Sequence, residues 1–216
     1  MSEFIYAPPQ VPLTILHADD DIVVADKPAG LLSVPGRGSE RADCLIARLR
    51  AEFPTVLLVH RLDLDTSGVI VFALTGQAQV HLGRQFENRR TQKRYVAMVS
   101  GHPSEAKGRV DLPLIVDWPN RPRQKVCHET GRPAQTDWRV LRQEGPNARL
   151  RLRPITGRSH QLRVHMQALG HPILGDTLYA DGAAVQWPRL MLHAEDLRLA
   201  HPATGQTMTF RAKVPF

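Results

Sequence analysis

The sequence has little cysteine, few aromatic residues and no long apolar run, and these shortages narrow the class of protein. Its 216 residues include two cysteines, Cys44 and Cys127, and neither belongs to a CxxC motif. A disulfide framework or a cysteine zinc site is therefore not expected, and the composition favours a reducing cytoplasm. The longest apolar run, GVIVFAL, is far shorter than the roughly 20 residues of a membrane span. Residues 1–20 also lack the basic and apolar segments of a signal peptide.

Acidic side chains are scarce beyond the first quarter of the chain. Residues 1–60 contain five basic and eight acidic side chains, whereas residues 61–216 contain 23 basic and 13 acidic ones. The net charge is +7, and most of the excess is arginine, which suits bidentate contacts with phosphate. The charge therefore favours a polyanionic partner, above all a nucleic acid, over a generally basic soluble protein.

Apolar patterning predicts an α+β fold in which short strands outnumber helices and form a largely antiparallel sheet. Residues 1–15 read as an extended arm. Helical spacing occurs at 43–53, 76–90 and 156–170. Strand patterns occur at 20–27, 66–75, 93–101, 108–114, 123–129, 134–142, 148–157, 189–202 and 205–214. The segment 66–75 is apolar on both faces and is therefore expected in the centre of a sheet.

The stretch HRLDLDTSG, residues 60–68, places a carboxylate directly before that buried strand. Asp63 could act there as a nucleophile, as a base or as a metal ligand together with His60 and Asp65, or it could bond only to local N–H groups. We do not expect a metal, because Arg61 would repel a cation and the set is too small.

Two further motifs carry charged or aromatic side chains next to apolar ones. In GRSHQLRVH, Arg163 should lie at the edge of a buried helix face, where an arginine generally needs an anionic partner. His160 and His165 are five residues apart and are expected to make structural hydrogen bonds or phosphate contacts. In QKRYVAMV, Tyr95 begins a strand and could be simply a half-buried aromatic.

Together, HRLDLDTSG, KRYVAMVSG and PITGRSHQLRVH resemble the successive motifs of the RluA family of pseudouridine synthases, and DKPAGLLSVPG resembles its leading motif. The resemblance implies a single α+β catalytic domain of that type over residues 16–216, after the arm at 1–15. It also implies that no S4-type RNA-binding module is present. The stretches at 110–136 and 170–180 are most similar to the branch that acts on both tRNA and 23S rRNA.

The same resemblance implies a catalytic set of Asp63, Tyr95 and Arg163. Conversion of uridine to pseudouridine neither adds nor removes a group, so no cofactor or metal is expected. Asp63 would attack C1′ or remove the C2′ proton, and the sequence leaves both open. Arg163 is expected within about 4 Å of it, holding it charged. Tyr95 would stack on the uracil and could help move the C5 proton.

The substrate implied is a folded RNA whose target base is flipped out. Arg61 would replace that base in the stack or clamp a phosphate, or else form a structural salt bridge. The RNA-contacting residues expected are Arg61, Arg89, Arg90, Lys93, Arg94, Arg121, Arg123, Lys125, Arg158 and His160. The expected partners are a tRNA anticodon stem-loop and a 23S rRNA hairpin, with a monomeric enzyme and no membrane. The alternatives are one of these RNAs alone, another rRNA site, a non-catalytic RNA-binding protein or a metal-dependent RNA hydrolase.

Overall fold

The structure, a computed structural model, describes residues 5–216 of the chain. The described residues divide into two compact units, one formed by residues 5–92 and 194–213 and the other by residues 93–193 and 214–216. The fold is α+β, as the patterning predicts, because strands greatly exceed helices in both units. No helix among the described residues is both long enough and apolar enough to cross a membrane.

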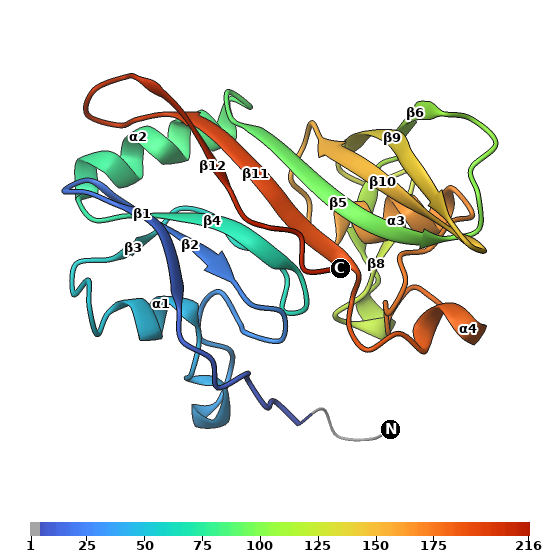
Figure 1. Cartoon of the computed structure of the whole chain (residues 1–216), viewed down its shortest axis with the longest axis horizontal. Helices are drawn as coiled ribbons and strands as arrows, with labels where there is room; N and C mark the ends of the chain where they lie inside the picture. The colour runs from blue at the N-terminus through green and yellow to red at the C-terminus, as the bar shows by residue number, and fades with distance from the viewer. Residues whose placement is uncertain (1–4) are drawn as a thin grey trace. The chain divides into compact units, whose positions relative to one another are not determined.

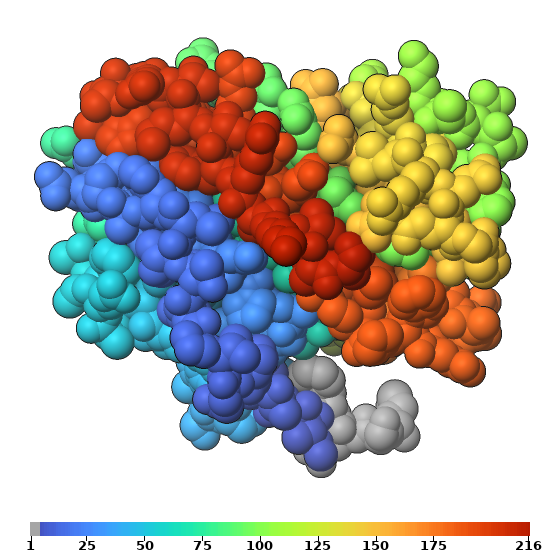
Figure 2. All heavy atoms as spheres, viewed as in Figure 1, coloured from blue at the N-terminus to red at the C-terminus, as the bar shows by residue number. Residues whose placement is uncertain are grey.

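The first unit is a sheet with helices beside it (Figure 1). Strands β2 and β4 pair antiparallel, β1 and β3 extend this pairing, β11 neighbours β4, and β12 pairs with β11. Its elements are β1 (Thr14–Ala18), β2 (Ile22–Lys27), η1 (Ser39–Arg41), α1 (Leu45–Leu49), β3 (Leu57–Leu58), β4 (Ser67–Ala73), α2 (Gly76–Glu87), β11 (Leu192–Ala200) and β12 (Thr207–Arg211). Figure 2 shows the β11–β12 region, in red, against the blue N-terminal strands, in agreement with the contact between β1 and β12.

The core of this unit follows from the two-sided apolar strand. Every residue of β4 is buried, as predicted for 66–75. Helix α2 begins at Thr75, whose side-chain oxygen accepts the N–H of Ala78, and it presents Ala78 and Leu82 to the core. Helix α1 covers Leu45–Leu49 and is shorter than the predicted 43–53, with Cys44 and Arg50 as its end residues.

Gly68 explains the last letter of the HRLDLDTSG motif. Its φ is 114°, and a Cβ at this position would overlap the backbone of Ala194 on the neighbouring strand. Any other residue would force β4 and β11 apart, so the motif requires glycine for close packing of backbone against backbone.

The second unit is an antiparallel sheet in the order β5-β10-β9-β6 and a separate hairpin, β7-β8. Its elements are β5 (Gln92–Ser100), β6 (Lys107–Asp111), β7 (Leu114–Val116), η2 (Trp118–Asn120), β8 (Gln124–Val126), β9 (Gln135–Glu144), β10 (Asn147–Pro154), α3 (Gln161–Ala168) and α4 (Gly182–Val185).

Strand β10 confirms the predicted alternation. Leu150 and Leu152 are fully buried in the core, while Arg149, Arg151 and Arg153 lie on the other face with partial or full exposure. Leu162 and Met166 of α3 join the same core. The helix ends as predicted at Gly170, whose φ is 85°.

Candidate active site

The Asp63 loop is fixed by hydrogen bonds to the backbone on both sides of the carboxylate residue. The hydroxyl of Ser33 donates to the carbonyl of Leu62 at 2.8 Å and accepts its N–H at 3.1 Å. On the other side, the carbonyl of Leu64 accepts from the Lys27 ammonium at 2.8 Å. Hydrogen bonds thus hold the backbone of Leu62 and of Leu64, the two neighbours of Asp63. They restrict the backbone of Asp63, whose side chain is half-buried.

Lys27 is the largest fully buried side chain of the protein's described residues. Its ammonium donates to the carbonyls of Pro28, Leu31 and Leu64 at 3.0, 2.6 and 2.8 Å. Three carbonyl dipoles compensate part of the cost of removing an ammonium from water. The leading motif DKPAGLLSVPG thus folds into the support of the Asp63 loop.

His60, weighed as a metal ligand from the sequence, has another task. Its Nε2 accepts the N–H of Val71 at 3.2 Å, and its ring stacks on Phe86 with the centroids 4.4 Å apart. A nitrogen that accepts a backbone proton has no lone pair for a metal ion. His60 therefore joins the loop to strand β4 and helix α2.

Arg163 lies on α3 and is more deeply buried than the sequence predicts. It is 4% exposed, and it forms a bidentate pair with Asp176, which is fully buried. Nε and Nη2 donate to the two carboxylate oxygens at 2.8 and 2.7 Å. The oxygen that accepts Nη2 also accepts the N–H groups of Leu178 and Tyr179. The guanidinium is therefore held in one orientation by a planar fork.

Tyr179 connects this pair to the start of α3. The Arg163 guanidinium lies 5.1 Å from the centre of the tyrosine ring. The tyrosine hydroxyl accepts the N–H of Gln124 at 2.7 Å and lies 2.8 Å from Nδ1 of His160. The hydroxyl thus joins His160, at the start of α3, to the backbone of β8. His160 also has a left-handed backbone, with φ at 53°, a conformation costly for a residue other than glycine.

Tyr95 lies on β5 opposite Leu152 and is half-buried against the core of the second unit. Asp63 belongs to the first unit, and Tyr95 and Arg163 belong to the second. The other motif histidine, His165, is fully buried and bonds to Thr136 and to the carbonyl of Leu112, which confirms a structural role. Burial lowers the pKa of His165 against the opposing effect of the Leu112 carbonyl.

The predicted RNA-contacting residues differ in their surroundings. The exposed ones are Arg61, Arg89, Arg90, Arg94, Arg121 and Lys125. Arg121 stacks on the exposed ring of Trp118 at 3.9 Å, and Lys125 pairs with Asp117 at 3.4 Å. Arg123 lies over Tyr179, and Arg158 donates to the carbonyl of Pro133. Lys93 is half-buried, and burial lowers its pKa.

A possible metal-binding group occurs away from these motifs, at Asp19, Asp21 and His201. The Asp19 carboxylate already accepts the N–H groups of Asp21 and Ile22 and bonds to Nε2 of His201 at 3.1 Å. Nδ1 of His201 accepts the N–H of Thr204, so Nε2 carries the proton. The group is a hydrogen-bonded turn in which the Asp19 carboxylate and both ring nitrogens of His201 already have protein partners.

Sequence reasoning did not identify the supporting residues Lys27, Ser33, Asp176 and Tyr179. One available signal was the lysine at the end of the apolar strand IVVADK. A lysine in a buried strand is expected to have hydrogen-bond partners, because an unpaired ammonium is rarely buried. The sequence carried no comparable signal for Ser33, Asp176 or Tyr179.

The chain is similar to known proteins over nearly its whole length. The family described as RNA pseudouridylate synthase matches residues 21–168. The chain is 59% identical to the dual-specificity RNA pseudouridine synthase RluA of Escherichia coli (strain K12) over 98% of both chains. It is 52% identical to that of Yersinia pestis, over 94% of this chain and all of the relative. The structure of human RNA pseudouridylate synthase domain containing 1 is similar with a TM-score of 0.79 and 30% identity, over 97% of this chain and 87% of that one.

Proposed function

The chain belongs to the RNA pseudouridylate synthase family, and on that premise we propose that Asp63 carries the isomerisation of uridine to pseudouridine in RNA. Tyr95 and Arg163 complete the proposed catalytic set. The observation that carries the proposal is the fixed loop: Ser33 and Lys27 hold the backbone on both sides of one half-buried carboxylate. Such preorganisation serves a group that must meet one atom of a substrate.

The reaction balances without a further reactant. The N1–C1′ bond breaks, the freed uracil turns, C5 bonds to C1′, and the proton at C5 moves to N1. Asp63 either attacks C1′ or removes the proton at C2′, and both roles need its ionised form. In this proposal Arg163, whose Nε and Nη2 donate to Asp176, favours the ionised form of the Asp63 carboxylate. Tyr95 offers its ring to the uracil.

The proposed substrates are the anticodon stem-loop of tRNA and a hairpin of 23S rRNA. The support is the similarity to dual-specificity synthases over nearly the whole chain. Compact stem-loops present unstacked bases, and a base in a strained loop costs less to flip than one in a helix. We propose that the enzyme is a monomer in the cytoplasm. We also propose that Arg61 enters the base stack of the RNA in place of the flipped base, or binds a phosphate beside it.

The test is tritium release from C5-labelled uridine in tRNA and 23S rRNA transcripts. Wild type should release tritium from both RNAs, with release unaffected by EDTA, and Asp63→Asn should release none while binding RNA as well as wild type. Release by Asp63→Asn at the wild-type rate would refute the role of Asp63. Release from one transcript alone would refute dual specificity, and loss of release with EDTA would favour a metal-dependent reaction.

A further inference from the structure

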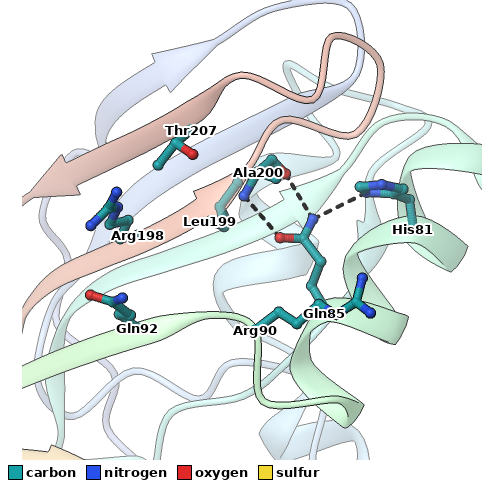
Figure 3. Close-up of a pocket in the computed structure, with 8 residues that line it drawn as sticks. All are labelled: His81, Gln85, Arg90, Gln92, Arg198, Leu199, Ala200 and Thr207. Carbon is teal, nitrogen blue, oxygen red and sulfur yellow. Dashed lines mark hydrogen bonds between the residues drawn. The ribbon is translucent and has the colours of Figure 1, made fainter.

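A polar hollow lies in the first unit, formed by α2, the start of β5 and the β11–β12 hairpin (Figure 3). Its volume is about 260 Å³. The lining residues are His81, Gln85, Arg90, Gln92, Arg198, Leu199, Ala200 and Thr207. None of them is acidic, and five of them present an exposed polar side chain. Such a lining offers both hydrogen-bond donors and positive charge, which are the features that a site for an anion needs.

The two arginines of the hollow differ from the arginines of this protein that form ion pairs. Arg48, Arg109 and Arg163 each pair with a carboxylate. Among the residues that the structure describes, neither Arg90 nor Arg198 has a carboxylate partner. Two exposed guanidinium groups give the lining of the hollow a positive charge, which would attract an anion.

The buried side of the hollow is formed by Gln85, which hydrogen bonds hold in place. Gln85 is 6% exposed, and its amide forms two hydrogen bonds with the backbone of Ala200, of 2.7 and 2.8 Å (Figure 3). The same amide nitrogen lies 3.1 Å from Nδ1 of His81. As the amide nitrogen is a donor, Nδ1 is the acceptor, and neutral His81 carries its proton on Nε2. The histidine therefore adds a donor at the rim of the hollow.

The position of Arg90 is set by the end of helix α2. The N–H of Arg90 bonds to the carbonyl of Gln85 at 2.8 Å, and the N–H of Arg89 bonds to that of Phe86 at 3.2 Å. This is the double hydrogen bond of a Schellman motif, with Arg89 left-handed at a φ of 57°. The chain leaves the helix along one path, and Arg90 lines the hollow as a consequence.

We propose that this hollow binds a phosphodiester of the RNA backbone, outside the nucleotide that Asp63 isomerises. The inference rests on the proposed function, which supplies the RNA. An exposed hollow of this size is smaller than the roughly 300–1,000 Å³ of pockets that enclose small ligands. A stretch of polymer crossing the surface needs no enclosure, and two arginines and a threonine are typical phosphate contacts.

The test compares Arg198→Ala with Arg84→Ala in the full chain. Arg84 is an exposed arginine of α2 outside the hollow, so both variants lose one charge. We expect Arg198→Ala to weaken binding of an anticodon stem-loop about 3- to 10-fold at low salt. The slope of log Kd against log salt should fall by about 0.7 to 0.9. Arg84→Ala should change both less.

Equal RNA affinities of the two variants would overturn the proposal. A measurement with inorganic phosphate distinguishes a site for free phosphate from a site for the RNA backbone. Phosphate could raise the melting temperature of wild type but not of Arg198→Ala, while wild type and Arg198→Ala bind RNA equally well. In that case the hollow is a small-anion site and the RNA inference is wrong. Binding and tritium release are measured on the same samples, so loss of isomerisation with normal RNA binding would count against the proposed function alone.

Discussion

The buried cation of Arg163 affects both the stability of the second unit and the proposed catalysis. Arg163 is nearly inaccessible to water, and Asp176 is the carboxylate that neutralises it within that unit. Removing one member of a buried ion pair leaves the other charge uncompensated, which typically costs about 3–5 kcal/mol. Replacing both members by apolar side chains of similar volume is often neutral. Stability and catalysis can therefore be separated at this pair.

We predict that Asp176→Asn lowers the free energy of unfolding by about 3 kcal/mol and also lowers turnover, because the guanidinium loses both its partner and its orientation. The double variant Arg163→Met with Asp176→Leu should regain most of the stability but none of the turnover. Urea unfolding and tritium release measure the two quantities. A double variant as active as wild type would show that Arg163 has no part in the reaction.

At the scale of elements, the end of helix α2 carries a conformational cost. Arg89 occupies a left-handed position that glycine fills in most Schellman motifs, and a residue with a Cβ there is strained by roughly 1 kcal/mol. An arginine kept in such a position indicates use of its side chain. The predicted use is contact with RNA phosphate, next to the hollow lined by Arg90.

We predict that Arg89→Gly raises the free energy of unfolding by about 0.5–1 kcal/mol and weakens RNA binding. Arg89→Ala is the matched control, because it removes the same charge but keeps the left-handed Cβ. It should weaken RNA binding as much as Arg89→Gly without the gain in stability. Thermal unfolding and filter binding test this, and unchanged RNA affinity in both variants would remove Arg89 from the RNA surface.

The elements themselves were largely predictable, because their patterns are local. Buried strand β4 and helix α2 follow from the period of apolar residues in the sequence. The partners of charged residues were not predictable in the same way. Asp176 lies 13 positions after Arg163, and Leu64 lies 37 positions after Lys27, so only the folded chain brings these groups together. The spacing of a motif identifies the reacting residue, but not the residues that hold it.

At the scale of the whole molecule, the division into two compact units was not predicted. The chain enters the second unit after Gln92, returns at Ala194 and leaves the first unit again after Lys213. Composition does not reveal such a division, because both units have a strand-rich core and two of the three boundaries fall inside strands, β5 and β11. The proposed catalytic residues come from both units, which makes the separate stability of each unit relevant to activity.

The two units should respond differently to acid. In the second unit, burial lowers the pKa of His165 below its usual value. The unfolded chain therefore binds a proton near pH 6.5 that the folded unit does not, and stability falls as the pH drops below that value, by at most about 1.4 kcal/mol per pH unit. In the first unit, burial opposes the shift of Asp19, but hydrogen bonds from His17, two backbone N–H groups and His201 lower its pKa to about 2. The Asp19 contribution is present above about pH 4 and is lost only between about pH 4 and pH 2.

We therefore predict that acidification from pH 7 to pH 5.5 weakens the second unit before the first. Hydrogen exchange, corrected for the intrinsic rate, should show falling protection in α3 and β9, with protection in β2 and β4 retained. His165→Gln removes the titrating group and should abolish this difference, because glutamine is neutral at every pH and the unfolded chain then gains no proton at this position. Equal loss of protection in both units of the wild type would mean that His165 does not control the acid response. Loss confined to β2 and β4 would reverse the assignment and point to a group in the first unit.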